Sequence, residues 1–150
     1  MYSIEAAKAF EAGILKEDSG RTRAAMENAG MAIGRALHAD YREIREWPED
    51  AAVLVLAGKG LNTGDAFVAC RLLAERVPGL RITVVQASPP EELNPLAAAA
   101  LEELKAVVKI PLQLTGIRET PGAPAGPVDV VLDGLYGMGF SPPLREEPAA

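Results

Sequence analysis

The chain has 150 residues, 49% of them hydrophobic, and its 21 Asp and Glu residues outnumber its 15 Lys and Arg residues. A chain of this length commonly makes one domain with a substantial core. The acidic balance and the absence of a basic stripe argue against nucleic-acid binding, and no apolar stretch reaches the ~20 residues of a membrane span. The single cysteine, Cys70, cannot form an internal disulfide, and no signal-peptide core is present, so the cytoplasm is the default compartment.

Two helices are expected in the first forty residues. The first has an apolar stripe that recurs every three or four residues, formed by Ile4, Ala7, Phe10 and Ile14. Residues 18–20 (DSG) break this helix, and Ser19 is suited to cap the next one. The second helix has a seam whose small residues allow close helix packing, formed by Met26, Gly30, Ile33 and Leu37. Both helices are expected to lie on a sheet.

Strand and helix patterns alternate from residue 51 onward. Residues 51–57 (AAVLVLA) are wholly apolar, which is typical of a strand covered on both faces. Residues 65–76 predict a helix, and residues 81–87 (RITVVQA) predict a second buried strand. A further helix follows Asn94, because Asn is a favoured N-cap and Pro fits the first turn. Its apolar seam consists of Leu93, Ala97, Leu101 and Leu104.

The last part of the chain completes the pattern. Residues 107–114 are expected to hold a third, shorter strand around Pro111, residues 121–127 (PGAPAGP) a turn-rich connector, and residues 128–133 (VDVVLD) the last strand. This alternation predicts an α/β fold, a three-layer Rossmann-like parallel sheet with helices on both faces. One domain over residues 1–150 is expected, with neither a second domain nor an internal repeat.

Two glycine-rich loops lie where ligands bind in open α/β sheets, beyond the carboxyl ends of the strands. The first, residues 58–65, leads into a helix whose start offers free N–H groups to an anion. The second, residues 133–141, leaves the last strand. The first loop lacks the G-x-G-x-x-G spacing of dinucleotide-binding folds, and its Gly64 is followed by Asp65 rather than by the Lys of a P-loop. Hydride transfer with NAD and P-loop phosphoryl transfer are therefore disfavoured.

The two carboxylates of these loops are the main candidates for chemistry, since such a group can hold a cation or accept a proton. Asp65 fits equally well a purely electrostatic role at the helix start. For Asp133 a function is favoured, because a carboxylate that leaves a buried strand into a glycine loop has little structural purpose. The only histidine, His38, is expected at the surface, so neither a His-based metal site nor a Ser-His-Asp triad is indicated. Trp47 is expected to anchor packing, and Lys59 to be solvated.

Three segments of the chain carry a resemblance: residues 25–30 (AMENAG), 53–75 (VLVLAGKGLNTGDAFVACRLLAE) and 128–145 (VDVVLDGLYGMGFSPPLR). Together they resemble the NAD(P)H-hydrate epimerase family, the YjeF N-terminal domain. Residues 25–30 (AMENAG) are similar to the helical M-E-N-A-G signature of the family. Residues 53–75 resemble its strand, its G-x-G-N-N-G-G-D loop and its V-A-A-R-x-L helix. Residues 128–145 resemble its D-x-x-x-D-A-x-F-G-x-G-x-x-R-P-L segment. The resemblance covers nearly the whole chain, in the right order.

The resemblance implies an isomerase of nicotinamide nucleotide repair, which binds hydrated NADH or NADPH and interconverts its R and S epimers with a potassium ion in the site. It implies a substrate loop formed by Leu61, Asn62, Thr63, Gly64 and Asp65. A second substrate loop is implied at Gly137, Met138, Gly139, Phe140, Ser141, Pro142 and Pro143. Asn62 and Asp133 fall on potassium ligands of the family, and Asp65 takes an acid/base or positioning role.

Two departures from the family pattern stand out. The family's N-N-G-G-D reads L-N-T-G-D here, so one amide is lost and a glycine is replaced by Thr63. Because threonine tolerates positive φ poorly, the loop is expected to be reshaped. The family's next block, D-x-P-S-G, has no counterpart in the chain. The expectation is a domain truncated at its C-terminus, either a fragment or a protein that has lost part of the site.

Two other hypotheses stay open. One is a catalytically degenerate module of the same fold that binds nucleotides or dimerises, as in proteins similar to the RNA-decapping scaffold. The other is the N-terminal part of a bifunctional enzyme, because relatives are often fused to an ADP-dependent hydrate dehydratase, which a separate chain can also supply. Apolar helix faces are compatible with a homodimer. The expected ligand is a small molecule, with no nucleic-acid or membrane partner.

Overall fold

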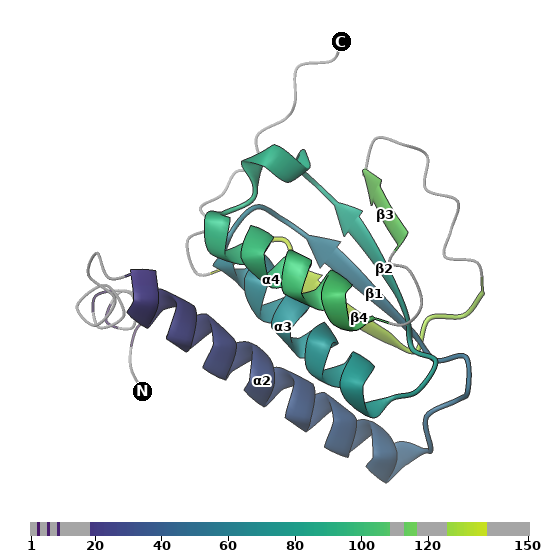
Figure 1. Cartoon of the computed structure of the whole chain (residues 1–150). Coiled ribbons are helices and arrows are strands. Elements are labelled where there is room, and N and C mark those ends of the chain that lie inside the picture. Colours follow the sequence, from purple (N-terminus) through teal and green to yellow (C-terminus); the bar gives the residue numbers. More distant parts are fainter. Residues whose placement is uncertain are drawn as a thin grey trace.

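The computed structural model describes residues 3, 6, 9, 19–108, 113–116 and 126–137. The main elements in chain order are α2 (Ser19–Ile44), β1 (Ala52–Ala57), α3 (Leu61–Arg76), β2 (Arg81–Gln86), the short 3₁₀ helix η1 (Pro90–Glu92), α4 (Pro95–Val107), β3 (Gln113–Gly116) and β4 (Val130–Gly134). The strands form one parallel sheet in the order β3-β2-β1-β4 (Figure 1). The predicted Rossmann-like parallel α/β fold is confirmed.

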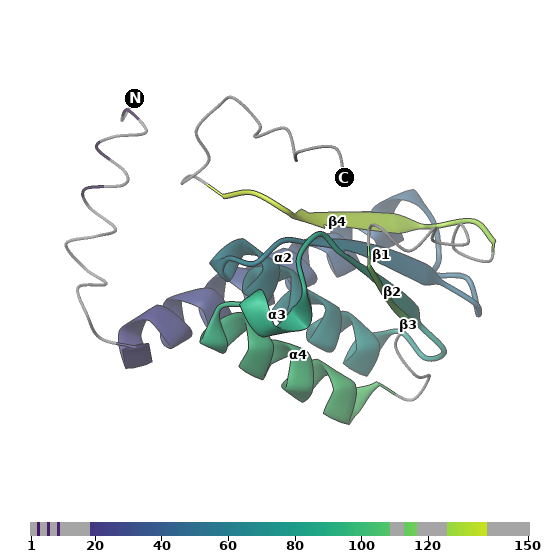
Figure 2. The same ribbon diagram turned by 90° about the horizontal axis from the view of Figure 1, so that it is seen from above.

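The helices α2, α3 and α4 lie on the same side of this sheet (Figure 2). The core between the sheet and these helices contains four buried side chains of β1 and β2, namely Val53, Val55, Ile82 and Val84. Helix α3 connects β1 to β2, and α4 connects β2 to β3, so both connections move along the sheet in the same direction. Right-handed connections that move in the same direction place their helices on the same face of the sheet. The described residues contain no helix on the other face, where a second layer was expected. There Val131 of β4 is 54% exposed.

Helix α2 packs on α3 through small residues spaced by four. Met26, Gly30 and Gly34 are the buried residues of α2. A Cβ at Gly30 would lie 2.5 Å from the Cβ of Val68, so the two backbones approach too closely for a side chain there. The predicted seam is correct at Met26 and Gly30 but wrong at Ile33, which is 39% exposed. The buried positions instead recur every four residues, so that Gly34 follows Met26 and Gly30 on the same face of the helix.

Other predicted elements differ from the structure mainly at their ends. Helix α4 begins as expected, with the Asn94 side chain accepting a hydrogen bond from the Leu96 N–H at 2.9 Å. All four residues of its predicted seam are buried. The third strand, expected over residues 107–114, is described as β3 over Gln113–Gly116, and the first residue of the expected range, Val107, belongs to α4. Pro111 and most of the predicted first helix lie outside the described residues, and within these no helix is long and apolar enough to cross a membrane.

Asp129 ties the start of β4 to β1 and to the end of α2. Its carboxylate accepts hydrogen bonds from the Ala52 N–H at 2.9 Å, from the Tyr41 hydroxyl at 2.8 Å and from the Arg45 guanidinium at 2.8 Å. Burial alone would raise the pKa of Asp129, but these three donors and the positive charge of Arg81 outweigh it and lower the pKa below its usual value. Trp47 stacks on Tyr41 with ring centroids 3.8 Å apart, which agrees with its predicted packing role.

Candidate active site at the switch point of the sheet

Strands β1 and β4 are neighbours at the point where the order of the strands reverses. From β1 the chain moves through α3 to β2 on one side, whereas β4 pairs with β1 on the other side. Open α/β sheets bind ligands at such topological switch points. The glycine loops predicted over residues 58–65 and 133–141 both begin at this place, although β4 continues through Gly134 and so includes the first two residues of the second loop.

Most of the first predicted loop is helix. Helix α3 begins at Leu61, four residues before the predicted start, and Gly60 is its N-cap in an extended conformation with φ −92° and ψ −175°. No side chain caps this end and no acidic residue lies in its first turn. The first N–H groups of a helix have no acceptor within it, and the helix dipole is positive there. The start of α3 therefore suits the phosphate oxygens of a nucleotide.

Asp65 consequently lies in the second turn of α3 and is partly buried. A Cβ at Gly30 would come within 2.6 Å of the Asp65 carbonyl oxygen, so this part of α3 rests directly on α2. The interpretation of Asp65 as a residue of the first helical turn is wrong, because the helix starts earlier. Its acid/base role stays a prediction.

Thr63 joins the two loops. Its side chain is fully buried, and its hydroxyl oxygen lies 3.0 Å from the Gly58 carbonyl oxygen and 2.9 Å from the Gly134 carbonyl oxygen. The predicted conflict with positive φ does not arise, because Thr63 is a helical residue. Sequence analysis missed this contact. Its only signal was a hydroxyl-bearing residue among the glycines that follow a buried strand.

The two predicted potassium ligands meet at the same place. The Asn62 side-chain N–H₂ donates to the Tyr136 carbonyl at 3.0 Å and lies 3.4 Å from the Asp133 carbonyl oxygen. One carboxylate oxygen of Asp133 accepts from the Leu135 N–H at 2.9 Å, and the residue is exposed at the end of β4. These bonds engage neither the amide oxygen of Asn62 nor the second carboxylate oxygen of Asp133.

The donor set fits a hard monovalent cation. An amide oxygen, a carboxylate oxygen and backbone carbonyls are the oxygen ligands that such cations accept. The described residues hold no group of three or more His, Cys, Asp or Glu side chains arranged for a metal. A cage of several carboxylates, which divalent Ca²⁺ favours, is therefore absent from this part of the chain. A potassium ion held by Asn62 and Asp133 would therefore meet one charged oxygen and otherwise neutral ones.

Glycines keep the two loops in contact. A Cβ at Gly58 would lie 2.2 Å from the Leu135 carbonyl oxygen, and a Cβ at Gly134 would lie 3.0 Å from the Thr63 Cα. Gly137, the first residue of the predicted second substrate loop, faces Asn62, whose Cβ would be 3.7 Å from an added side chain. The other predicted residues of that loop, Met138 to Pro143, lie outside the described residues.

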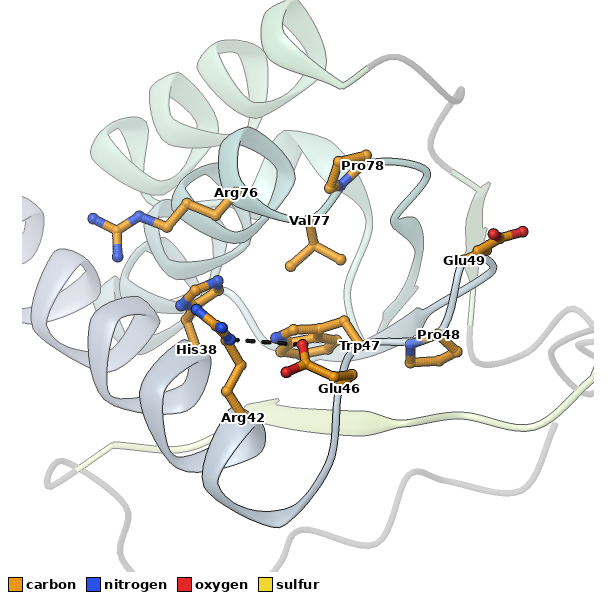
Figure 3. A pocket seen from close by; sticks show the side chains of 9 residues that line it. All are labelled: His38, Arg42, Glu46, Trp47, Pro48, Glu49, Arg76, Val77 and Pro78. Atoms are coloured by element: carbon orange, nitrogen blue, oxygen red, sulfur yellow. Dashed lines mark ion pairs between the residues drawn. The ribbon is translucent and has the colours of Figure 1, made fainter.

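A separate pocket of ≈ 350 Å³ lies at the opposite end of the sheet (Figure 3). It is lined by His38, Arg42, Glu46, Trp47, Pro48, Glu49, Arg76, Val77 and Pro78. His38, expected at the surface, is partly buried here, and burial together with Arg76 and Arg42 lowers its pKa. Two guanidiniums and two carboxylates balance each other in this pocket, which favours neither an anion nor a cation.

Comparison with known proteins identifies the family of the chain. Residues 22–150 match the sequence profile of the family described as YjeF-related protein N-terminus. The chain belongs to this family. Among curated YjeF-related proteins, the NAD(P)H-hydrate epimerase of Bordetella pertussis is 37% identical over 124 residues, which are 83% of this chain and 47% of that protein. The NAD(P)H-hydrate epimerase of Rhodobacter capsulatus is 34% identical over 79% of this chain and 53% of its own length.

Longer relatives and a solved structure complete the comparison. The bifunctional NAD(P)H-hydrate repair enzyme of Gloeobacter violaceus is 36% identical over 82% of this chain and 22% of its own length. The crystal structure of the yeast protein YNL200c superposes with a TM-score of 0.74 at 23% identity, over 96% of this chain and 59% of that one, and so shares the fold. The chain spans about half the length of the curated epimerases it matches.

Proposed function

We propose that this YjeF-related chain carries an NAD(P)H-hydrate epimerase site, which interconverts the R and S epimers of hydrated NADH and NADPH. The observation that carries the proposal is the hydrogen bond of 3.0 Å from the Asn62 side chain to the Tyr136 carbonyl. It brings together, at the switch point, two motif segments about 70 residues apart in sequence. The names of the relatives at 34–37% identity support the same activity.

The residues divide the work between binding and proton transfer. The start of α3, at Leu61 and Asn62, would hold phosphate oxygens through backbone N–H groups. Epimerisation breaks and re-forms a bond at the hydrated carbon, and Asp65 is the carboxylate we assign to the accompanying proton transfer. Asn62 and Asp133 would hold potassium, which would offset the negative charge of the substrate diphosphate.

A direct test uses purified R-hydrate of NADH, chiral chromatography and two charge-matched variants. We expect the wild-type chain to produce the S epimer faster in potassium than in sodium buffer. Asp65→Asn is expected to abolish the conversion with the fold intact, whereas Asp40→Asn, at an exposed position of α2, retains it. Full activity of Asp65→Asn would remove this residue from the mechanism.

A second candidate function is a nucleotide-binding module without turnover. It is favoured by the replacement of two positions of the family loop by Leu61 and Thr63, of which the first packs partly against the core and the second is buried. The same assay separates the two hypotheses. Binding of the hydrate by a folded chain without conversion supports the module, whereas conversion excludes it.

The setting of the site is also a proposal. The bifunctional relatives favour cooperation with a hydrate dehydratase, fused or separate. We further propose that the protein is cytoplasmic, since hydrated nicotinamide cofactors arise where these cofactors are used. We also propose that it forms a homodimer. Sedimentation of the purified chain tests the dimer.

A further inference from the structure

The pairing of β1 with β4 weakens where the two strands separate. The last contact of this ladder runs from the Gly58 N–H to the Gly134 carbonyl over 3.4 Å, longer than an ordinary backbone hydrogen bond. Beyond it, the loop to α3 and residues 135–137 stay in contact, because the Asn62 side chain donates to the Tyr136 carbonyl. The Thr63 hydroxyl fills this point, at 3.0 Å from the Gly58 carbonyl oxygen and 2.9 Å from the Gly134 carbonyl oxygen.

One hydroxyl serves two acceptors here. A threonine hydroxyl carries a single proton and donates to one carbonyl at a time. Gly58, Thr63 and Gly134 are all buried, so water does not readily replace this donor. An unpaired buried carbonyl is costly, and replacing Thr63 by an apolar residue would remove this donor from the Gly58 carbonyl and leave the Gly134 carbonyl only the long bond from the Gly58 N–H. The hydroxyl therefore holds the two strand ends at one separation.

We propose that Thr63 is a positioning residue of the epimerase site, which fixes the first turn of α3 against the loop that follows β4. The inference rests on the proposed function for its catalytic meaning. Thr63 is 0% exposed and does not reach a ligand. It acts through the adjacent Asn62, whose amide meets the Tyr136 carbonyl only while the two loops keep their spacing.

The test compares Thr63→Val with Thr63→Ser. Valine keeps the shape but removes the hydroxyl, whereas serine keeps the hydroxyl and removes a methyl group. Since a displacement of ~1 Å at a site can cost on the order of a hundredfold in rate, we expect Thr63→Val to lower kcat by roughly tenfold to a hundredfold, with a smaller change in KM. Thr63→Ser is expected to rescue kcat to within about threefold of wild type.

Hydrogen exchange of backbone amides gives a readout that does not require activity. In Thr63→Val the amides of Gly58 and Leu135 are expected to exchange at least tenfold faster than in wild type, and in Thr63→Ser at nearly the wild-type rate. An inactive wild-type chain would refute the proposed function, while the exchange data still decide whether Thr63 joins the loops. Wild-type exchange and kcat in Thr63→Val, or equal losses in both variants, would overturn the inference.

Discussion

Replacing Gly58 by alanine tests the close contact between the two loops. The added Cβ would lie 2.2 Å from the Leu135 carbonyl oxygen and 2.9 Å from its carbon, whereas ordinary contact begins near 3.4 Å. Both atoms belong to backbone, so the loop after β4 has to retreat by about 1 Å. Gly60→Ala is the matched control, because nothing lies within 4 Å of its Cβ and its extended backbone accepts alanine.

The magnitude follows from packing and hydrogen bonds. Overpacking typically costs about 1–3 kcal/mol, and a retreat that breaks one bond of the Thr63 hydroxyl adds about 1 kcal/mol. Gly58→Ala is therefore expected to lower the free energy of unfolding by about 2–4 kcal/mol, or Tm by about 4–16 °C for a chain of this size. Gly60→Ala replaces an N-cap glycine and is expected to cost about 1 kcal/mol or less.

Urea unfolding, followed by far-UV circular dichroism and by the fluorescence of the only tryptophan, measures both variants. Trp47 lies at the opposite end of the sheet and so reports unfolding of the core rather than a change in the loops. Equal unfolding midpoints for Gly58→Ala and Gly60→Ala would refute the contact between the Gly58 and Leu135 backbones.

Three further predictions concern residues outside the site. Because the folded pKa of Asp129 is lowered, its charge stabilises the fold above the unfolded value of about 4 and loses that effect as pH falls through the folded pKa. The loss of unfolding free energy in Asp129→Asn should therefore be largest near pH 7 and shrink below pH ~4; a loss independent of pH would contradict this. Burial raises the pKa of Cys70 to about 12, so Ellman's reagent should label it only in urea, and fast labelling of the native chain would contradict its burial. The Arg71 guanidinium pairs with Glu27 of α2 and with Glu103 of α4. Lysine has no planar guanidinium that can bond both carboxylates, so Arg71→Lys should lower the free energy of unfolding by about 1–3 kcal/mol. An unchanged urea midpoint would show that the two ion pairs do not stabilise the fold.

Much of the fold follows from local patterns in the sequence. The apolar runs of β1 and β2 and the N-cap Asn94 are short-range signals, and the structure places them as predicted to within a residue or two. The start of α3 was missed because glycine, asparagine and threonine are weak helix formers. In the structure Thr63 gains buried hydrogen bonds with Gly58 and Gly134, which offset this weakness.

The sequence predicted which residues gather at the site, but not the contacts that these residues make. Topology alone brings Asn62 and Asp133 to one end of the sheet, since Asn62 follows β1 and Asp133 lies near the end of the neighbouring parallel strand β4. The bridge made by Thr63 depends on how closely the Gly58 and Gly134 backbones approach, and no short-range pattern encodes that distance. The side on which the helices lie depended likewise on the direction of each crossover, which follows from the strand order rather than from periodicity.

The most direct test of the central claim is a titration of the ¹⁵N-labelled chain with the hydrate of NADPH, followed by two-dimensional NMR. A site at the switch point predicts saturable shifts for Asn62, Thr63 and Leu135, and an unchanged indole N–H signal for Trp47 at the far end of the sheet. Shifts centred on Trp47 and His38, or no shifts at millimolar hydrate in a folded sample, would contradict it.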